Sequence, residues 1–143
     1  MDCRGGLLGL TLSGLVPGPN GRLMTICGTV GGQSLDARTG RTLKMITQVG
    51  DEDEVWYDPG TNRYYFAHRK SGAAEATSAQ SGAIGVVDAA GDAFVADIPM
   101  EGAGVHSVAV NARTNTSLYP WLEKVSWWSR SATELYDHKT TVG

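Results

Sequence analysis

The sequence predicts an all-β protein assembled from antiparallel hairpins that repeat along the chain. Two observations carry this prediction. Short apolar runs alternate with turns rich in Gly, Pro, Asn and Asp, and two different hairpin patterns recur at nearly the same spacing. The chain also has 19 glycines among its 143 residues, near twice the average share of about 7%. Many short strands joined by tight turns account for this excess.

The first hairpin pattern is clearest in residues 53–66. A strand runs to Asp58, a Pro-Gly-Thr-Asn turn follows, and an aromatic strand returns from Arg63. Residues 106–119 repeat this pattern, since Asn62 and Asn115 lie 53 residues apart (115 − 62). Both runs place Asn where a tight turn needs a residue that tolerates positive φ.

A looser copy of this hairpin comes earlier in the chain. Residues 7–12 can form a short strand, residues 17–21 have the Pro and Asn-Gly signals of a turn, and residues 22–27 form the returning strand. Arg22 and Arg63 then occupy equivalent positions, 41 residues apart (63 − 22).

The second hairpin pattern occupies residues 34–48 and recurs in residues 86–98. Asp36 and Asp88 begin the two turns and are 52 residues apart (88 − 36). Two hairpins that recur at one period give four short antiparallel strands in each unit of roughly 40 to 55 residues. That is the design of a β-propeller blade.

We therefore predict one domain over residues 1–143, with repeat units at about 7–49 and 53–101 and a partial third unit at 106–120. A polar Ser/Ala/Gly stretch at residues 70–81 interrupts the second unit, and we expect it to be a solvent-exposed loop.

The repeat pattern stops after Pro120. Residues 121–143 hold three of the four tryptophans, and Ser131 and Glu134 have the spacing of a helix capping box. We expect a short irregular or helical C-terminal tail here. The strand that should return after Tyr119 is not evident from the sequence.

Charge and composition exclude several classes of function. The net charge is −3 without a basic stripe, which argues against a nucleic-acid partner. No apolar run approaches the roughly 20 residues of a membrane helix, and residues 1–12 do not form a clear signal peptide. Cys3 and Cys27 are not in a Cys-x-x-Cys pair, so a structural zinc site is not indicated, and we expect thiols in preference to a bridge.

The hairpin sequences resemble a known family. Residues 53–65, 85–90 and 106–111 are similar to bacterial β-propellers with YVTN-type or NHL-like repeats, a group related in fold to the gluconolactonases. The resemblance covers about residues 7–120. It implies a propeller fold that is often exported and is often linked to lactonase or binding activity. The compartment of this chain is not indicated by its own residues.

One feature departs from the family. A propeller closes with four to eight blades, whereas this chain has two units and part of a third. It resembles a two-to-three-blade piece of a larger propeller with an unrelated C-terminal tail. Such an incomplete propeller has open strand edges, so we expect it to self-associate.

The polar residues at the starts of the inner strands are the candidate site. In a propeller these starts surround the mouth of the central channel, which here brings together Asp53 and Glu54 with His106 and Ser107. These four are the candidate ligand-binding residues. The interpretation we favour over a ligand role is that they cap strand ends or form hydrogen bonds with the next blade. Glu54 and His106 are the candidate catalytic residues.

Asp53 and Glu54 are also the candidate ligands of a divalent cation such as Ca²⁺, because hard cations prefer oxygen ligands. The acidic run at residues 51–54 lacks the Gly and Asn spacing of a calcium loop, so a solvated acidic turn is the favoured alternative. No serine-hydrolase elbow or nucleotide-binding glycine motif occurs.

The sequence favours a non-catalytic binding or scaffold module made of propeller blades, with a small polar ligand at the channel mouth. The alternative is a metal-dependent lactone hydrolase that uses Asp53, Glu54 and His106. A third alternative is that the chain on its own has no evolved function. The aromatic residues at 56–57 and 64–66 are expected to pack between blades in preference to stacking on a carbohydrate.

Overall fold

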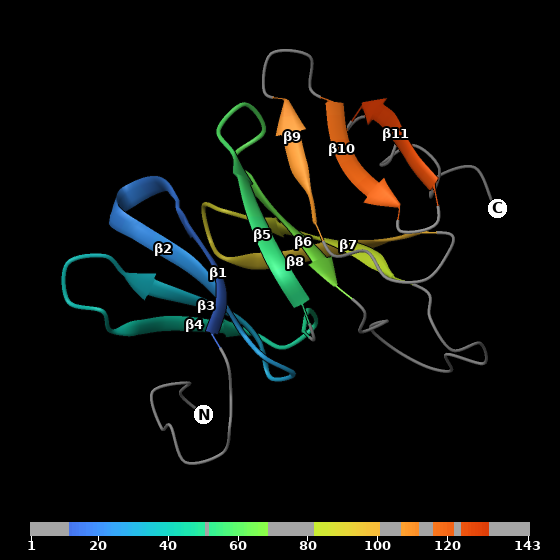
Figure 1. Ribbon diagram of the computed structural model, residues 1–143. Helices are drawn as coiled ribbons and strands as arrows, with labels where there is room; N and C mark the ends of the chain where they lie inside the picture. Colours follow the sequence, from blue (N-terminus) through green and yellow to red (C-terminus); the bar gives the residue numbers. More distant parts are fainter. Residues whose placement is uncertain are drawn as a thin grey trace, which may run out of the picture.

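The computed structural model describes residues 12–50, 52–68, 82–100, 107–111, 116–121 and 124–131, and for β10, β11 and the first two residues of β5 it describes the backbone. The predicted all-β fold is confirmed (Figure 1). The elements are β1 (Leu12–Pro17), the 3-10 turn η1 (Pro19–Gly21), β2 (Arg22–Cys27), β3 (Gly31–Asp36), β4 (Thr42–Ile46), β5 (Glu52–Asp58), β6 (Arg63–His68), β7 (Ala83–Asp88), β8 (Ala93–Pro99), β9 (Ala109–Asn111), β10 (Thr116–Trp121) and β11 (Lys124–Ser131).

The strands form three antiparallel sheets in chain order. The first sheet has the order β1-β2-β3-β4, the second has the order β5-β6-β7-β8, and the third has the order β11-β10-β9. Within the described residues, no helix is long and apolar enough to cross a membrane.

The two four-stranded sheets repeat each other in register as well as in order. In β4 the pairing with β3 shifts between Lys44 and Thr42, so Leu43 is the extra residue of a bulge. In β8 the pairing with β7 shifts in the same way around Val95. Leu43 and Val95 are 52 residues apart (95 − 43), the spacing seen in the sequence between Asp36 and Asp88. The repeat therefore extends to the irregularities of the backbone.

Aspartates end three strands and fix the turns that follow. Asp58 accepts hydrogen bonds from the backbone of Gly60 at 2.9 Å and from the Thr61 hydroxyl at 2.7 Å. Asp88 accepts from the backbone of Ala90 and Gly91 at 3.0 and 3.1 Å. These turns close because a short carboxylate satisfies backbone N–H groups that the ladder leaves free.

Asp36 does the same at the end of β3. It accepts hydrogen bonds from the hydroxyl and backbone of Thr39 at 2.8 and 2.7 Å. These bonds favour the ionised carboxylate and lower the pKa of Asp36 below its usual range. The turns also need positive φ, which Asn20, Asn62 and Asp92 adopt at 58°, 54° and 50°. Asn and Asp tolerate this region better than other non-glycine residues.

The first strand lies later in the chain than the sequence suggested. The expected strand at residues 7–12 lies outside the described residues except for Leu12, and β1 runs to the turn itself at Pro17. The reason is the register, since Pro17 pairs with Leu23 and Leu12 pairs with Cys27. The residues that pair with β2 are those directly before the turn, and a proline is tolerated at the end of an edge strand.

The expectation of an irregular or helical tail from residue 121 onward is wrong for the described part of that segment. Lys124–Ser131 forms β11, which pairs with β10 from Thr116 opposite Ser131 to Trp121 opposite Lys124. Val and Trp are residue types that favour strands, and both occur in the segment that pairs with β10. Residues 132–143 and the polar stretch at 70–81 lie outside the described residues.

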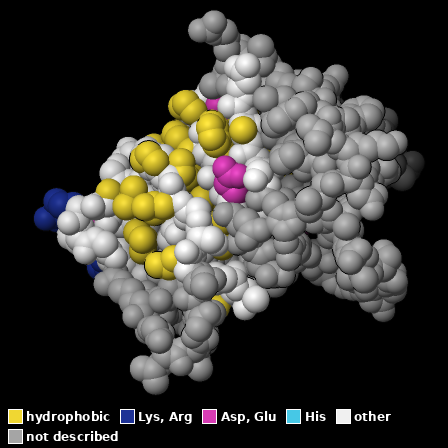
Figure 2. Space-filling view, in the orientation of Figure 1, with side chains coloured by type: hydrophobic (Ala, Val, Ile, Leu, Met, Phe, Trp, Pro, Cys, Tyr) yellow, Lys and Arg dark blue, Asp and Glu magenta, His cyan; other side chains and the backbone are white. Residues whose placement is uncertain are grey.

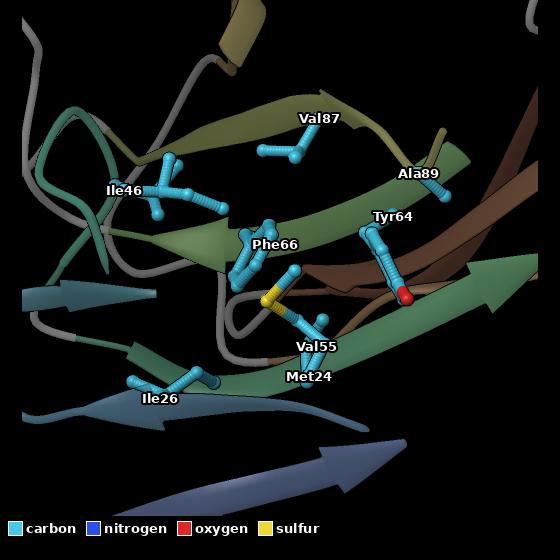
Figure 3. Close-up of a cluster of buried hydrophobic side chains, with 9 residues drawn as sticks. Met24, Ile26, Ile46, Val55, Tyr64, Phe66, Val87 and Ala89 are labelled. Atoms are coloured by element: carbon cyan, nitrogen blue, oxygen red, sulfur yellow. The ribbon is translucent and has the colours of Figure 1, made fainter. Parts of the chain in front are cut away.

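Two hydrophobic clusters join the sheets. One cluster lies between the first and second sheets (Figure 3) and consists of Met24, Ile26, Ile46, Val49, Val55, Tyr64, Phe66, Val87 and Ala89. The other lies on the opposite side of the second sheet, against the segment that leads into β9, and consists of Tyr65, Ala67, Ile84, Val86, Val108 and Val110. Alternate residues of β6 and β7 therefore face different neighbours, as strand geometry requires.

Cys27 is buried and disulfide-bonded, so the expectation of thiols is wrong at this position. The only other cysteine of the chain is Cys3, which lies outside the described residues. Cys27 pairs with Leu12, the first residue of β1, and Leu12 follows Cys3 by nine residues (12 − 3). The end of β2 is thus beside the place where the N-terminal segment enters the sheet.

Candidate functional site

The first strands of the three sheets lie side by side. β5 contacts β1 on one side and β9 on the other (Figure 1). This is the arrangement that successive blades give to their inner strands. The candidate site therefore belongs to the region where β5 and β9 begin.

The structure describes the predicted site residues only in part. Glu54 lies in β5 with a half-buried side chain, and Ser107 is half-buried two residues before β9. Asp53 belongs to β5, but its side chain is outside the description, and His106 lies outside the described residues. Their roles as ligand-binding, metal-binding or catalytic residues stay predictions. No group of three or more His, Cys, Asp or Glu side chains that could hold a metal occurs among the described residues.

Asp53 occupies an irregular position in its strand. Glu52 pairs with His68 and Glu54 pairs with Ala67, so Asp53 is the extra residue of a bulge in β5. A bulge bends a strand and changes the direction of a side chain, and bulges are frequent beside functional sites. This signal was not visible in the sequence, where residues 51–54 read as a plain acidic run.

The first strand of the first sheet has a bulge near its start as well. It lies at Gly14, which has a φ of 57°. The hydroxyl of Thr25 donates a hydrogen bond of 2.7 Å to the carbonyl of Gly14. A Cβ at Gly14 would come within 3.1 Å of the backbone nitrogen of Val55. Glycine here lets β1 approach β5 closely.

His68 is a buried polar residue whose partner could not be foreseen. It is fully buried in β6, and its Nε2 atom lies 2.8 Å from a carboxylate oxygen of Asp97 in β8. The two side chains meet across β7 at Gly85, where an added Cβ would lie 3.1 Å from Nε2. His68 is thus held as part of the second sheet. His138 lies outside the described residues.

The aromatic residues pack mainly between sheets, as predicted. Tyr64, Tyr65 and Phe66 are fully buried. Tyr57 is half-buried, and its ring lies 5.2 Å from that of Tyr64 at an interplanar angle of 46°. Trp56 differs, because 37% of its surface is exposed on β5.

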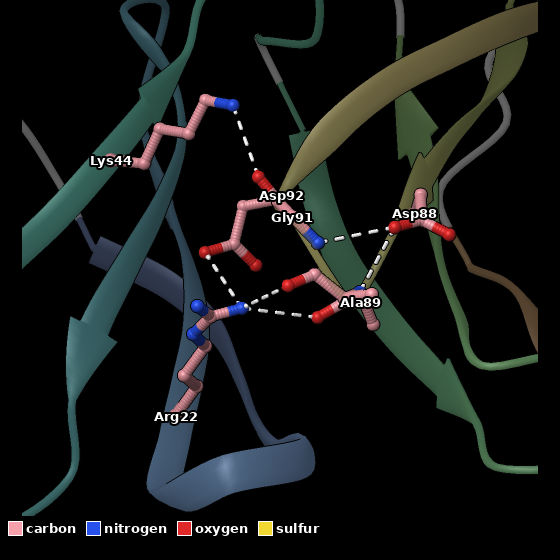
Figure 4. Close-up of polar contacts among 7 residues, drawn as sticks. Arg22, Lys44, Asp88, Ala89, Gly91 and Asp92 are labelled. Carbon is pink, nitrogen blue, oxygen red and sulfur yellow. Dashed lines mark hydrogen bonds and ion pairs between the residues drawn. The ribbon is translucent and has the colours of Figure 1, made fainter.

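A polar contact joins the turn between β7 and β8 to the first sheet (Figure 4). Nη1 of Arg22 donates hydrogen bonds to the carbonyls of Ala89 and Ala90 at 3.2 and 2.9 Å and lies 3.6 Å from the Asp92 carboxylate. Lys44 donates to the carbonyl of Gly91 at 3.1 Å. We call these residues the turn clasp. The side chain of Asp92 is only 3% exposed, so Arg22 supplies the opposite charge that a buried carboxylate needs.

The hydroxyl of Tyr64 has a raised pKa, and besides burial the charge of Asp92 is one of its causes. Burial and, after it, the negative charge of Asp92 raise the pKa of Tyr64 to about 12. Its hydroxyl is buried without a hydrogen-bond partner among the described residues. A Cβ on Gly18 would collide with this hydroxyl, at 1.7 Å. The turn before β2 therefore packs directly on Tyr64.

Exposed apolar side chains remain on the first sheet and on β5. Leu12 and Leu15 of β1 are 59% and 64% exposed, and Leu43 of β4 is 38% exposed. Figure 2 shows hydrophobic side chains gathered over the first sheet and β5 on the face in view. Apolar surface of this kind is typical of sites that bind other protein surfaces.

No family model and no curated protein matches the chain. A search of solved structures finds similarity to a propeller chain in "Crystal Structure of Mitotic Checkpoint Complex", with a TM-score of 0.60 at 14% identity. The chain has the fold of a partial β-propeller. The match covers 84% of this chain and 36% of the other, so this chain spans about a third of that protein.

A second similar structure is the computationally designed Ika4 protein, with a TM-score of 0.43 at 12% identity, covering 84% of this chain and 91% of that one. The blades of the partial propeller are the first and second sheets, with the third sheet beside the second blade. The finer resemblance to YVTN- or NHL-type propellers stays a prediction.

Proposed function

We propose that this partial propeller is a non-catalytic binding or scaffold module. The observation that supports this most is the pair of stacked four-stranded blades with exposed leucines on the first strand. The similar chain of known structure belongs to a multi-protein complex, the mitotic checkpoint complex. Rigid blades with apolar side chains left on their surface suit protein binding. We also propose that open blade edges make the chain self-associate.

A small polar ligand is proposed to bind where β5 and β9 begin. Glu54, in β5, and Ser107, two residues before β9, are half-buried there, and Asp53 is the extra residue of the bulge in β5. His106 completes the proposed set. Carboxylate, imidazole and hydroxyl groups together suit a ligand that both donates and accepts hydrogen bonds.

The experiment that tests the non-catalytic proposal measures metal content and lactone hydrolysis in the purified chain, with and without a chelator. We expect no hydrolysis that depends on metal. A rate that the chelator abolishes, restored by Ca²⁺ and lost in Glu54→Gln, would overturn the proposal in favour of a metal-dependent lactone hydrolase. Thr39→Ala, in an exposed turn at the end of β3, is the control variant that should change neither measurement.

A further inference from the structure

Three buried polar atoms beside the turn clasp have no hydrogen-bond partner among the described residues. They are the hydroxyl of Tyr64, the Oδ1 atom of Asp92 and the hydroxyl of Ser34. Tyr64 and Ser34 are fully buried, and Asp92 is 2% exposed. A buried polar group without a partner is costly, and most such groups in folded proteins bond to protein or to ordered water. Each of these atoms therefore needs a partner other than the described protein groups.

Asp92 keeps unused hydrogen-bonding capacity although Arg22 lies beside it (Figure 4). Nη1 of Arg22 donates hydrogen bonds to the carbonyls of Ala89 and Ala90. The same atom lies 3.6 Å from the Oδ2 atom of Asp92, which is beyond the usual length of a hydrogen bond. The ion pair thus balances the charge of the carboxylate, but Oδ1 still needs a donor.

The hydroxyl of Tyr64 lies close to this carboxylate. A Cβ on Gly18 would collide with the hydroxyl, and the backbone of Gly18 donates to the carbonyl of Arg22 at 2.9 Å. After burial, the charge of Asp92 is the next cause that raises the pKa of Tyr64. The two groups are nevertheless not in direct hydrogen-bond contact, since the hydroxyl has no partner among the described residues. Polar groups that are near but not in contact are often bridged by water.

Ser34 brings the first blade to the same place. It pairs with Met24 on one side and with Lys44 on the other, and paired residues have their side chains on one face of a sheet. Met24 packs in the cluster shared with the second blade, and Lys44 donates to the carbonyl of Gly91. The Ser34 hydroxyl therefore lies on the face toward the second blade, where it can donate or accept a hydrogen bond.

The charges around the site select its ligand. The carboxylate of Asp92 would repel an anion, and the side chains of Arg22 and Lys44 would repel a cation. A small neutral molecule that both donates and accepts is left.

We propose that one ordered water molecule binds here, accepts a hydrogen bond from the Tyr64 hydroxyl, and donates to Oδ1 of Asp92 and to the Ser34 hydroxyl. Buried waters typically make about three hydrogen bonds. The water joins the first two blades at the turn clasp, and this inference does not rest on the proposed binding function.

A crystal structure of the wild-type chain tests the site directly. We expect an ordered water within about 3.2 Å of the Tyr64 hydroxyl, Oδ1 of Asp92 and the Ser34 hydroxyl. A direct hydrogen bond between Tyr64 and Asp92, or the three atoms without a water between them, would overturn the proposal.

Tyr64→Phe tests the site in solution through the sign of its effect. A hydroxyl that is bonded to a buried water stabilises the fold, so its removal should raise the unfolding equilibrium constant about fivefold at neutral pH. An unpartnered buried hydroxyl is instead a cost, and its removal would lower this constant or leave it unchanged. Chemical denaturation measures the constant, and a lower or unchanged value would contradict the water bridge.

Magnetic relaxation dispersion of the solvent counts buried waters that exchange slowly. Tyr64→Phe combined with Ser34→Ala removes two of the three partners, so the count should fall by one relative to the wild type. Tyr65→Phe is the matched control, because Tyr65 is equally buried but belongs to the other cluster, and it should keep the wild-type count. The same count in the wild type and the double variant would show that no water depends on these hydroxyls.

Discussion

Gly85 shows how one residue without a side chain lets two blades meet. A Cβ at this position would lie 2.5 Å from Cγ1 of Val49, which comes from the segment between β4 and β5 and is fully buried. It would also lie 3.1 Å from Nε2 of His68. The close approach of the blades and the pairing of His68 with Asp97 thus both depend on the absence of a Cβ atom at Gly85.

We expect Gly85→Ala to lower the free energy of unfolding by about 1–3 kcal/mol, the usual cost of overpacking a core. Val49→Ala in the same chain should recover part of this loss, because it removes the methyl group that the new Cβ meets. Chemical denaturation of the two single variants and the double variant measures the coupling. Gly91→Ala is the control, since no atom lies within 4 Å of a Cβ there. Equal losses for Gly85→Ala and Gly91→Ala would contradict this account.

Tyr64 makes the stability of the protein depend on high pH. Its pKa is raised to about 12 in the folded chain, whereas an unfolded tyrosine titrates near 10. Between pH 10 and 12 the unfolded state therefore binds fewer protons, and stability falls as the pH rises. Tyr64→Phe should show a smaller decrease from pH 9 to 11.5 in denaturant midpoint than the wild type. The same decrease in both proteins would show that the Tyr64 hydroxyl does not titrate as described.

At the scale of elements, the hairpins are what the sequence predicts best. Both hairpin patterns and their spacing follow from short-range signals, namely Asn at the turns, Asp at the strand ends and alternation of apolar residues. β11 and the position of β1 were not predictable in this way, because both depend on pairing with a strand already in place. Local propensity gives the existence of a strand, whereas its register requires the neighbour.

The candidate site was only partly predictable for a related reason. The inner strands meet as expected, and this brings the segments of Glu54 and Ser107 to neighbouring strands. The bulge at Asp53 and the pairing of His68 with Asp97 involve residues that are distant in sequence, and the chain carries no local signal for either. The turn clasp joins Arg22 to Ala89 and Ala90, which lie 67 and 68 positions later in the chain. Only the stacking of the blades creates this contact.

The turn clasp predicts unequal effects for its two basic residues. Arg22→Gln leaves the Asp92 carboxylate buried without a charged partner and should cost about 2 kcal/mol, less than a fully buried pair because Arg22 is 25% exposed. Asp92→Asn added to Arg22→Gln should recover much of this loss, and asparagine keeps the positive φ that the turn requires. Lys44→Ala removes one exposed hydrogen bond and should cost less than about 0.5 kcal/mol. Equal costs at Arg22 and Lys44 would contradict a buried role for Asp92.

At the scale of the whole molecule, the shared cluster makes the first two blades one folding unit. Phe66 belongs to the second blade but packs with Met24 and Ile26 of the first. A Cβ added to Gly32 of the first blade would lie 3.0 Å from the Phe66 ring. Repeat proteins are stabilised through such interfaces between neighbours as much as within each unit. Destabilising one side of this interface should therefore destabilise the other.

We expect Phe66→Leu to speed amide hydrogen exchange in β2 and β3 as much as in β6 and β7, because opening either blade exposes the same cluster. Loss of the aromatic ring should lower the free energy of unfolding by about 1–3 kcal/mol. Amides that exchange through global unfolding should then exchange roughly 5- to 150-fold faster, which hydrogen exchange with mass spectrometry can measure. Ile84→Val is the control, since it trims the other cluster, against Val108 and Val110. That variant should increase the exchange rates of amides in the second blade and β9 more than those in the first blade. Faster exchange confined to β6 and β7 in Phe66→Leu would mean that the blades unfold independently.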